Sequence, residues 1–193
     1  ATRRRSADFL ALTKPRLNLL VLITTLGGLY LGAPAGVAAV TLFHTLVGTA
    51  LVAGGAAALN QVWERDTDGL MRRTRQRPVP DGRLAASEGT RFGLILSTAG
   101  LVQLAAGGNL AGEAAAARTP PGDVLLYTPL KRRTWLSTLI GAIPGALPPV
   151  IGWAAATGGV NLTGMTLFAI VFFWQIPHFL AIAWLYREDY ARA

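Results

Sequence analysis

The sequence lacks two things: cysteine anywhere among its 193 residues, and charged side chains in two long stretches, residues 17–63 and 134–186. Without cysteine the chain has no disulfides, no thiol catalysis and no thiolate metal site. The missing charge argues against a soluble protein, because soluble helices carry charged residues on their outer faces. Each charge-free stretch can hold two membrane spans of about 20 residues. We therefore expect an all-α fold, a multi-span bundle of transmembrane helices.

The charges that are present are mostly basic and lie in clusters between the apolar stretches. Eighteen Lys and Arg against ten Asp and Glu give a net charge of +8. Basic clusters between apolar spans are typical of the cytoplasmic loops of membrane proteins. We therefore predict a lipid bilayer as the partner and no nucleic acid, with residues 64–91 on the same side as the N-terminus.

Five spans are expected, at residues 17–32, 37–60, 92–107, 135–157 and 162–184. Residues 108–124 are atypical, because acidic, basic and proline residues there prevent a stable membrane helix. The positions of the basic clusters require one more crossing, so we infer a helix lost or altered between residues 101 and 126. The alternative is a re-entrant segment. His44, inside the second span, either contacts a neighbouring helix or binds substrate.

Acidic and amide side chains follow the second span at a spacing of four residues. On a helix Asn60, Glu64 and Asp68 share one face, at the membrane surface. Oxygen ligands of this kind suit Mg²⁺, which reaches its substrate through phosphate oxygens. Arg73 and Arg77 suit the phosphates themselves. The segment predicts a site for a divalent metal and a diphosphate; the alternative interpretation is a solvated surface loop.

Two further polar features, one inside this segment and one later in the chain, bear on the same site. Asp66 lies on a different face of the same helix and is expected to pair with an arginine. Tyr127 and Lys131 are four residues apart, so a helical turn there places them on one face.

Five blocks, in order along the chain, resemble the UbiA superfamily of intramembrane prenyltransferases, and within it the protoheme IX farnesyltransferases (haem O synthases). They are residues 12–16, 58–78, 127–134, 145–153 and 174–190. The resemblance implies a single transmembrane prenyltransferase domain over residues 1–193. About five to six of the family's roughly nine helices are expected, with the C-terminal helices absent.

The resemblance also implies roles for particular residues. Asn60, Glu64, Asp68 and Asp189 are expected to hold Mg²⁺ and, with Tyr127, to be catalytic; Arg73, Arg77, Lys131, Arg132 and His178 are expected to bind substrate. Glu64 stands where the family motif has aspartate, and Ala193 stands where its second motif has an aspartate. His178 is the candidate haem contact, unless it only satisfies a backbone carbonyl.

The reaction that the resemblance implies is transfer of farnesyl from farnesyl diphosphate to a vinyl group of haem b, giving haem O and diphosphate. An apolar cleft walled by Trp153, Trp174 and Phe179 would suit both substrates. Haem-pathway membrane enzymes are possible partners, and the arginine-rich loops favour a bacterial inner membrane with a cytoplasmic active face. The alternatives are a quinone or chlorophyll-type acceptor, or an inactive truncated bundle.

Overall fold

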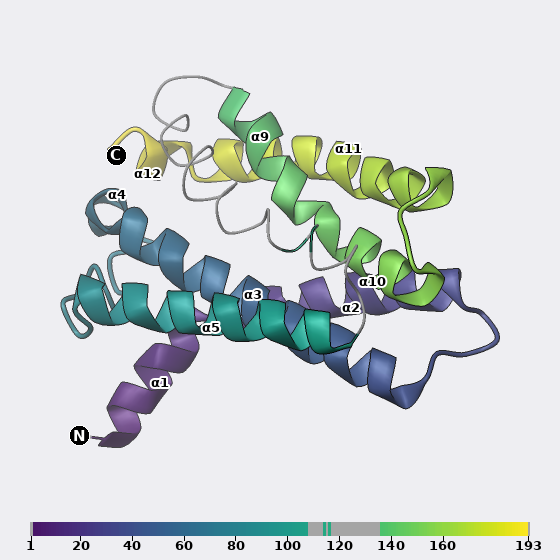
Figure 1. The fold of residues 1–193 in the computed structure, drawn as a ribbon. Coiled ribbons are helices and arrows are strands. Elements are labelled where there is room, and N and C mark those ends of the chain that lie inside the picture. Colours follow the sequence, from purple (N-terminus) through teal and green to yellow (C-terminus); the bar gives the residue numbers. More distant parts are fainter. Residues whose placement is uncertain (1, 108–113, 115, 117–135, 193) are drawn as a thin grey trace.

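The structure is a computed structural model and describes residues 2–107, 114, 116 and 136–192. Its helices are α1 (Thr2–Leu12), α2 (Pro15–Gly32), α3 (Ala39–Trp63), α4 (Arg65–Leu70), α5 (Ala86–Ala106), α9 (Leu136–Gly145), α10 (Leu147–Thr157), α11 (Leu162–Leu185) and α12 (Arg187–Tyr190). Within these residues there is no strand (Figure 1). The prediction of an all-α bundle is confirmed.

Four helical stretches of the described chain are long and apolar enough to cross a membrane. They are α2, α3, α11 and the segment Leu139–Thr157, which covers most of α9 with α10. The multi-span prediction is therefore confirmed. The expected span at residues 92–107 is also helical but belongs to the longer α5, whose first turns carry Glu88 and Arg91. The inferred lost helix falls mainly on residues outside the described ranges.

The span expected at residues 135–157 is found over Leu139–Thr157, but it consists of two helices and not one. α9 ends at Gly145 and α10 begins at Leu147. Pro148 and Pro149 lack the amide hydrogens that a continuous helix would need, whereas proline is well tolerated in the first turn of a new helix. The break therefore follows from the sequence Ala-Leu-Pro-Pro.

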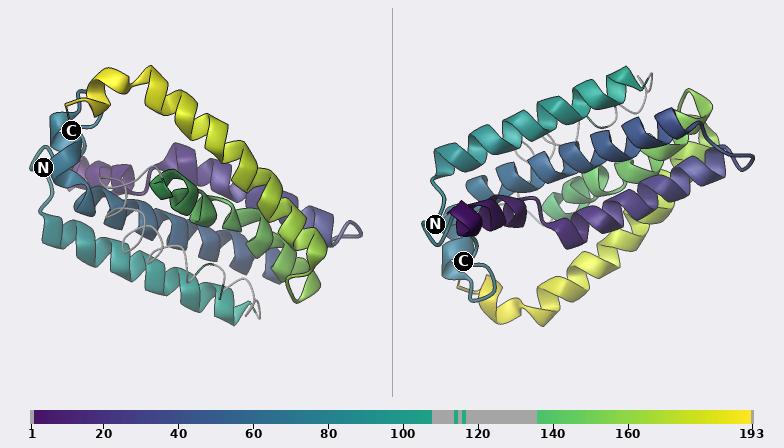
Figure 2. Two further views of the ribbon diagram at one scale, coloured as in Figure 1. Left: turned by 90° about the horizontal axis from the view of Figure 1, so that it is seen from above. Right: turned by 90° about the horizontal axis from the view of Figure 1, so that it is seen from below.

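α3 is the central helix, as its small residues predict: it contacts α1, α2, α5 and α10. α5 and α11 lie on opposite sides of the bundle (Figure 2). α2 and α10 approach until their backbones meet, because a Cβ added at Gly28 would lie 2.0 Å from the Pro149 carbonyl oxygen. Likewise, one added at Gly152 would lie 1.9 Å from the Thr25 carbonyl oxygen. Glycine allows this separation, as in other membrane bundles.

The polar segments gather at one end of the bundle. The N-terminus, α4, the start of α5 and α12 lie at that end, and the turns around residues 33–38 and 158–161 lie at the other (Figure 1). Ion pairs tie α1 to this end: Arg83 Nη1 is 2.5 Å from Asp8 Oδ1, and Arg5 pairs with Glu88. This arrangement places residues 64–85 and the chain's C-terminal segment beside one another.

Candidate functional site

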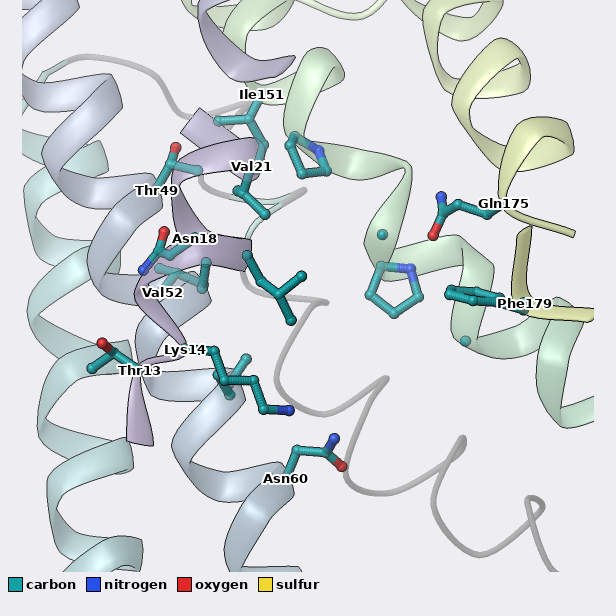
Figure 3. A pocket seen from close by; sticks show the side chains of 18 residues that line it. Thr13, Lys14, Asn18, Val21, Thr49, Val52, Asn60, Ile151, Gln175 and Phe179 are labelled. Carbon is teal, nitrogen blue, oxygen red and sulfur yellow. The ribbon is translucent and has the colours of Figure 1, made fainter. Parts of the chain in front are cut away.

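An apolar cavity of about 320 Å³ lies between α2, α3, α9, α10 and α11. Its walls are mainly aliphatic, with Val21, Val52 and Ile151 among them. Lys14 and Asn60 stand at one end, and Phe179 and Gln175 line the side formed by α11 (Figure 3). The cavity is therefore apolar along most of its length and polar at the end where the charged segments gather. Such a shape suits an amphipathic ligand with a long apolar part.

Asn60, Glu64 and Asp68 do not lie on one uninterrupted helix. α3 ends at Trp63, Glu64 is its C-cap, and α4 begins at Arg65. Hydrogen bonds from Glu64 N to Asn60 O (2.9 Å) and from Asp68 N to Glu64 O (2.8 Å) nevertheless keep the helical spacing across the junction. Asn60 lines the apolar cavity, and Asp68 is buried beyond it.

Asp68 is held by the arginine-rich loop, residues 71–85, which joins α4 to α5. Arg77 Nη1 donates to Asp68 Oδ2 at 2.5 Å, and the Thr74 hydroxyl donates to the Asp68 backbone oxygen at 2.9 Å. The Asp68 side chain is 6% exposed and that of Arg77 is 26% exposed. A charge-assisted pair buried to this degree fixes the loop against α4. Asp66 is exposed and pairs with Arg65 at 3.4 Å, so its expected arginine partner is found.

The loop is also connected to the end of α11. The Arg73 backbone N–H donates to Asp189 Oδ2 at 3.4 Å, and the Arg73 guanidinium lies 4.7 Å from the centre of the Tyr186 ring. The structure thus brings together an acid from each of the two expected motifs, Asp68 and Asp189, through neighbouring arginines of one loop. They lie 121 residues apart in the chain.

A second pocket, the basic pocket, opens beside the first and has a volume of about 410 Å³. Four cationic residues and one acidic residue line it: Lys14, Arg73, Arg77, Arg83 and Asp8. Gln61, whose amide donates to Leu12 O at 2.9 Å, closes its wall toward α3. Its excess of positive charge favours an anion.

The donor chemistry at this end fits Mg²⁺ without forming a complete cage. Among the described residues no three His, Cys, Asp or Glu side chains lie close enough together to hold a metal ion. Asn60, Glu64, Asp68 and Asp189 offer only hard oxygen donors. Mg²⁺ usually keeps several waters and takes one or two carboxylates together with substrate phosphates. A site with few protein ligands is therefore compatible with this ion.

Several expected contacts are not brought to the cavity. Trp174 is 61% exposed and stacks on His178, with ring centres 4.9 Å apart, on the outer face of α11. Trp153 is buried behind Gly164 and does not line the cavity. Of the three aromatic walls expected, only Phe179 lines it. The expectation failed because Trp174 precedes the inward-facing Gln175 by one position, about 100° around the helix.

Three of the expected site residues lie outside the described ranges, and one histidine has a packing role. Tyr127, Lys131 and Arg132 are among the residues that the structure does not describe. His44 Nδ1 is 3.2 Å from Gln103 O of α5, so the neighbouring-helix interpretation of this histidine holds.

Sequence reasoning assigned no role to several polar residues of the cavity wall: Lys14, Asn18, Thr49 and Gln175. Asn18 Oδ1 and Thr49 Oγ1 are buried and have no hydrogen-bond partner in the described part of the chain. Gln175 is 6% exposed, and its amide nitrogen is 3.3 Å from Val171 O and 3.4 Å from Ala142 O. A single polar residue in an apolar span was the available signal, because such residues face the bundle interior.

Fold and site together define a class: a multi-pass membrane protein with an intramembrane apolar cavity that ends at clustered acids and arginines. The UbiA prenyltransferase family model matches residues 21–193. The chain belongs to the UbiA prenyltransferase family.

Among curated relatives, a protoheme IX farnesyltransferase of Solibacter usitatus is 50% identical, over 96% of this chain and 67% of its own length. One from Myxococcus xanthus is 46% identical, over 97% of this chain and 64% of its own length. The chain thus spans about two thirds of the length of these relatives. A solved structure from work on digeranylgeranylglyceryl phosphate synthase has a similar fold, with a TM-score of 0.76 and 17% sequence identity. The match covers 88% of this chain and 59% of the chain in that structure.

Proposed function

We propose that this chain carries a prenyltransferase site that transfers farnesyl from farnesyl diphosphate to one carbon of a vinyl group of haem b, while water adds to the other carbon and releases a proton, giving haem O and diphosphate. The observation that carries the proposal is the apolar cavity, which ends at Asn60 and Lys14 and shares Lys14 with the basic pocket that Arg77 lines. An allylic diphosphate needs an apolar channel for its tail and concentrated positive charge for its head. The names of the two relatives support haem b as the acceptor.

Asn60, Glu64, Asp68 and Asp189 would hold Mg²⁺, and the chemistry it would supply there is neutralisation of charge on the departing diphosphate. We assign Arg73 and Arg77 to the phosphate oxygens, and their contacts with Asp189 and Asp68, the first through the Arg73 backbone N–H, support this assignment. We assign Lys131 and Arg132 to the same task and Tyr127 to the diphosphate or the developing cation. Catalysis is then mostly electrostatic stabilisation of the leaving group.

The apolar walls serve the other half of the reaction. Once the carbon–oxygen bond breaks, the allylic cation must meet the acceptor before it meets water. Val52, Ile151 and Phe179 line the cavity that Asn60 also lines, and apolar walls of this kind would keep water away from the cation. We keep His178 as a haem contact on the outer face of α11, where its ring stacks on Trp174 and is open to a flat ligand arriving from the lipid.

The positions of the charged segments support the same arrangement in the cell. The N-terminal basic residues, the arginine loop and α12 lie at one end of the bundle (Figure 1). We propose that this is the cytoplasmic face of a bacterial inner membrane, as the positive-inside rule requires. Farnesyl diphosphate then arrives from the cytoplasm and haem b through the lipid, from membrane enzymes of the haem pathway.

The experiment is an assay of detergent-solubilised protein with farnesyl diphosphate, haem b and Mg²⁺, with haem O identified by mass. Asp68→Asn is run in parallel, since it keeps the side-chain shape but removes the charge. We expect product from the parent chain and a loss of at least 100-fold in the variant. A quinone precursor or a chlorophyll-type ring offered in place of haem b tests the alternative acceptors. Diphosphate binding without turnover on any acceptor would show the inactive bundle instead.

A further inference from the structure

Lys14 stands in an unusual backbone conformation at the connection between α1 and α2. Its φ of 47° and ψ of 64° lie in the left-handed region, and it is the one residue other than glycine with positive φ in the described chain. Glycine adopts this conformation without strain, whereas lysine does not. Strained backbone of this kind persists where surrounding structure enforces it, and it concentrates at functional sites.

Lys14 is also where the two pockets meet. The apolar cavity and the basic pocket have two lining residues in common, Lys14 and Leu17. Leu17 is aliphatic, so Lys14 is the one charged group shared by both. Figure 3 shows its side chain reaching into the cavity at the end occupied by Asn60. The ammonium therefore lies on the boundary between an apolar space and a cationic one.

A prenyl diphosphate has the same division along its own length. Its isoprenoid chain suits the apolar cavity, and its diphosphate suits the pocket lined by Arg73, Arg77 and Arg83. The C1–O bond is the point where the apolar and anionic parts join. A substrate that fills both spaces must therefore place this bond beside Lys14.

We propose that Lys14 is a catalytic residue that donates a hydrogen bond to the bridging oxygen of the prenyl diphosphate as its C1–O bond breaks. Both electrons of that bond go to the oxygen, which leaves with the diphosphate, and the allylic carbon becomes cationic until the acceptor's electron pair reaches it. An ammonium beside the oxygen acts where negative charge develops, so it stabilises the transition state more than the ground state. This inference rests on the proposed prenyl transfer.

The test follows bond breaking directly, in farnesyl diphosphate labelled with oxygen-18 at the bridging position. Each cycle of ionisation and return moves label to the non-bridging oxygens of the same phosphate, with no acceptor required. Lys14→Gln is compared with Lys14→Arg and with Arg91→Gln, which removes an exposed cation on α5 that lines neither pocket. Thermal stability is measured for every variant, so that misfolding is recognised.

We expect Lys14→Gln to slow label scrambling and kcat by about 100-fold with little change in KM for farnesyl diphosphate. Lys14→Arg should recover part of the rate, and Arg91→Gln should leave it unchanged. A folded Lys14→Gln variant that scrambles label at the parent rate would overturn the role of Lys14 while leaving prenyl transfer intact. A higher KM with unchanged kcat would overturn it as well, since it would mean ground-state binding alone. A parent chain that neither scrambles label nor makes product would overturn the proposed function and this inference with it.

Discussion

Replacing Gly28 with alanine tests whether the α2–α10 contact sets the width of the bundle. The new Cβ would lie 2.0 Å from Pro149 O and 2.8 Å from Pro149 C, both backbone atoms that no rotamer change can move. A carbon and a carbonyl oxygen need about 3.3 Å, so the helices must separate by roughly 1.3 Å. Overpacking of this kind costs about 1–3 kcal/mol. For a chain of this length that loss lowers the unfolding temperature by roughly 2–12 °C.

Gly27→Ala is the matched control, because nothing lies within 4 Å of a Cβ at that position. Both variants gain the same helix propensity, about 1 kcal/mol, so their difference isolates the contact with Pro149. Thermal unfolding of the two proteins in one detergent gives that difference. Equal unfolding temperatures would show that α2 and α10 do not touch through their backbones, and the packing described above would be refuted.

Three further changes test the polar end. Arg77→Met should destabilise the folded chain by about 3 kcal/mol, because it leaves the buried Asp68 carboxylate unpaired; chemical denaturation measures this, and no loss would contradict the ion pair. The hydrogen bond from the Ala85 backbone N–H lowers the pKa of Glu88 most, and the charge of Arg5 adds to it against the opposing effect of burial. Glu88 therefore stabilises the fold above its usual pKa, and this contribution disappears as the pH falls through the lowered value. Glu88→Gln should therefore flatten the acidic side of a plot of unfolding temperature against pH. Chelation with EDTA, or Asp189→Asn, should reduce product at least 100-fold in the mass assay; undiminished product would exclude a metal at this end.

The spans could be predicted closely because their signal is local. Absence of charge and runs of apolar residues marked α2, α3 and α11 to within a few residues. The pairing of α2 with α10 could not be predicted in the same way. Gly28 and Gly152 indicate close approach to some helix, but which helix approaches is decided by the arrangement of the whole bundle.

In the candidate site, too, the features set by local sequence could be predicted, and those set by the arrangement of the bundle could not. Spacing alone grouped Asn60 with Asp68, and the structure keeps that helical register through the Glu64 junction. Lys14 was missed because nothing in the motif Thr-Lys-Pro-Arg reveals a left-handed backbone, and the structure has one there. Trp174 was wrongly expected in the cavity wall, because its aromatic character does not show which face of α11 it lies on. Gln175, the polar residue next to it, carried that information.

The Asp68–Arg77 ion pair has a consequence for the strength of ligand binding at the proposed site. The Arg77 guanidinium takes up Oδ2 of the Asp68 carboxylate, so a divalent cation that used this oxygen at the proposed metal site would compete with Arg77. Arrival of the cation would release Arg77, whose freed charge then faces the basic pocket that it lines. Cation entry would thereby prepare the anion site, and each ligand should increase the affinity for the other by the same factor.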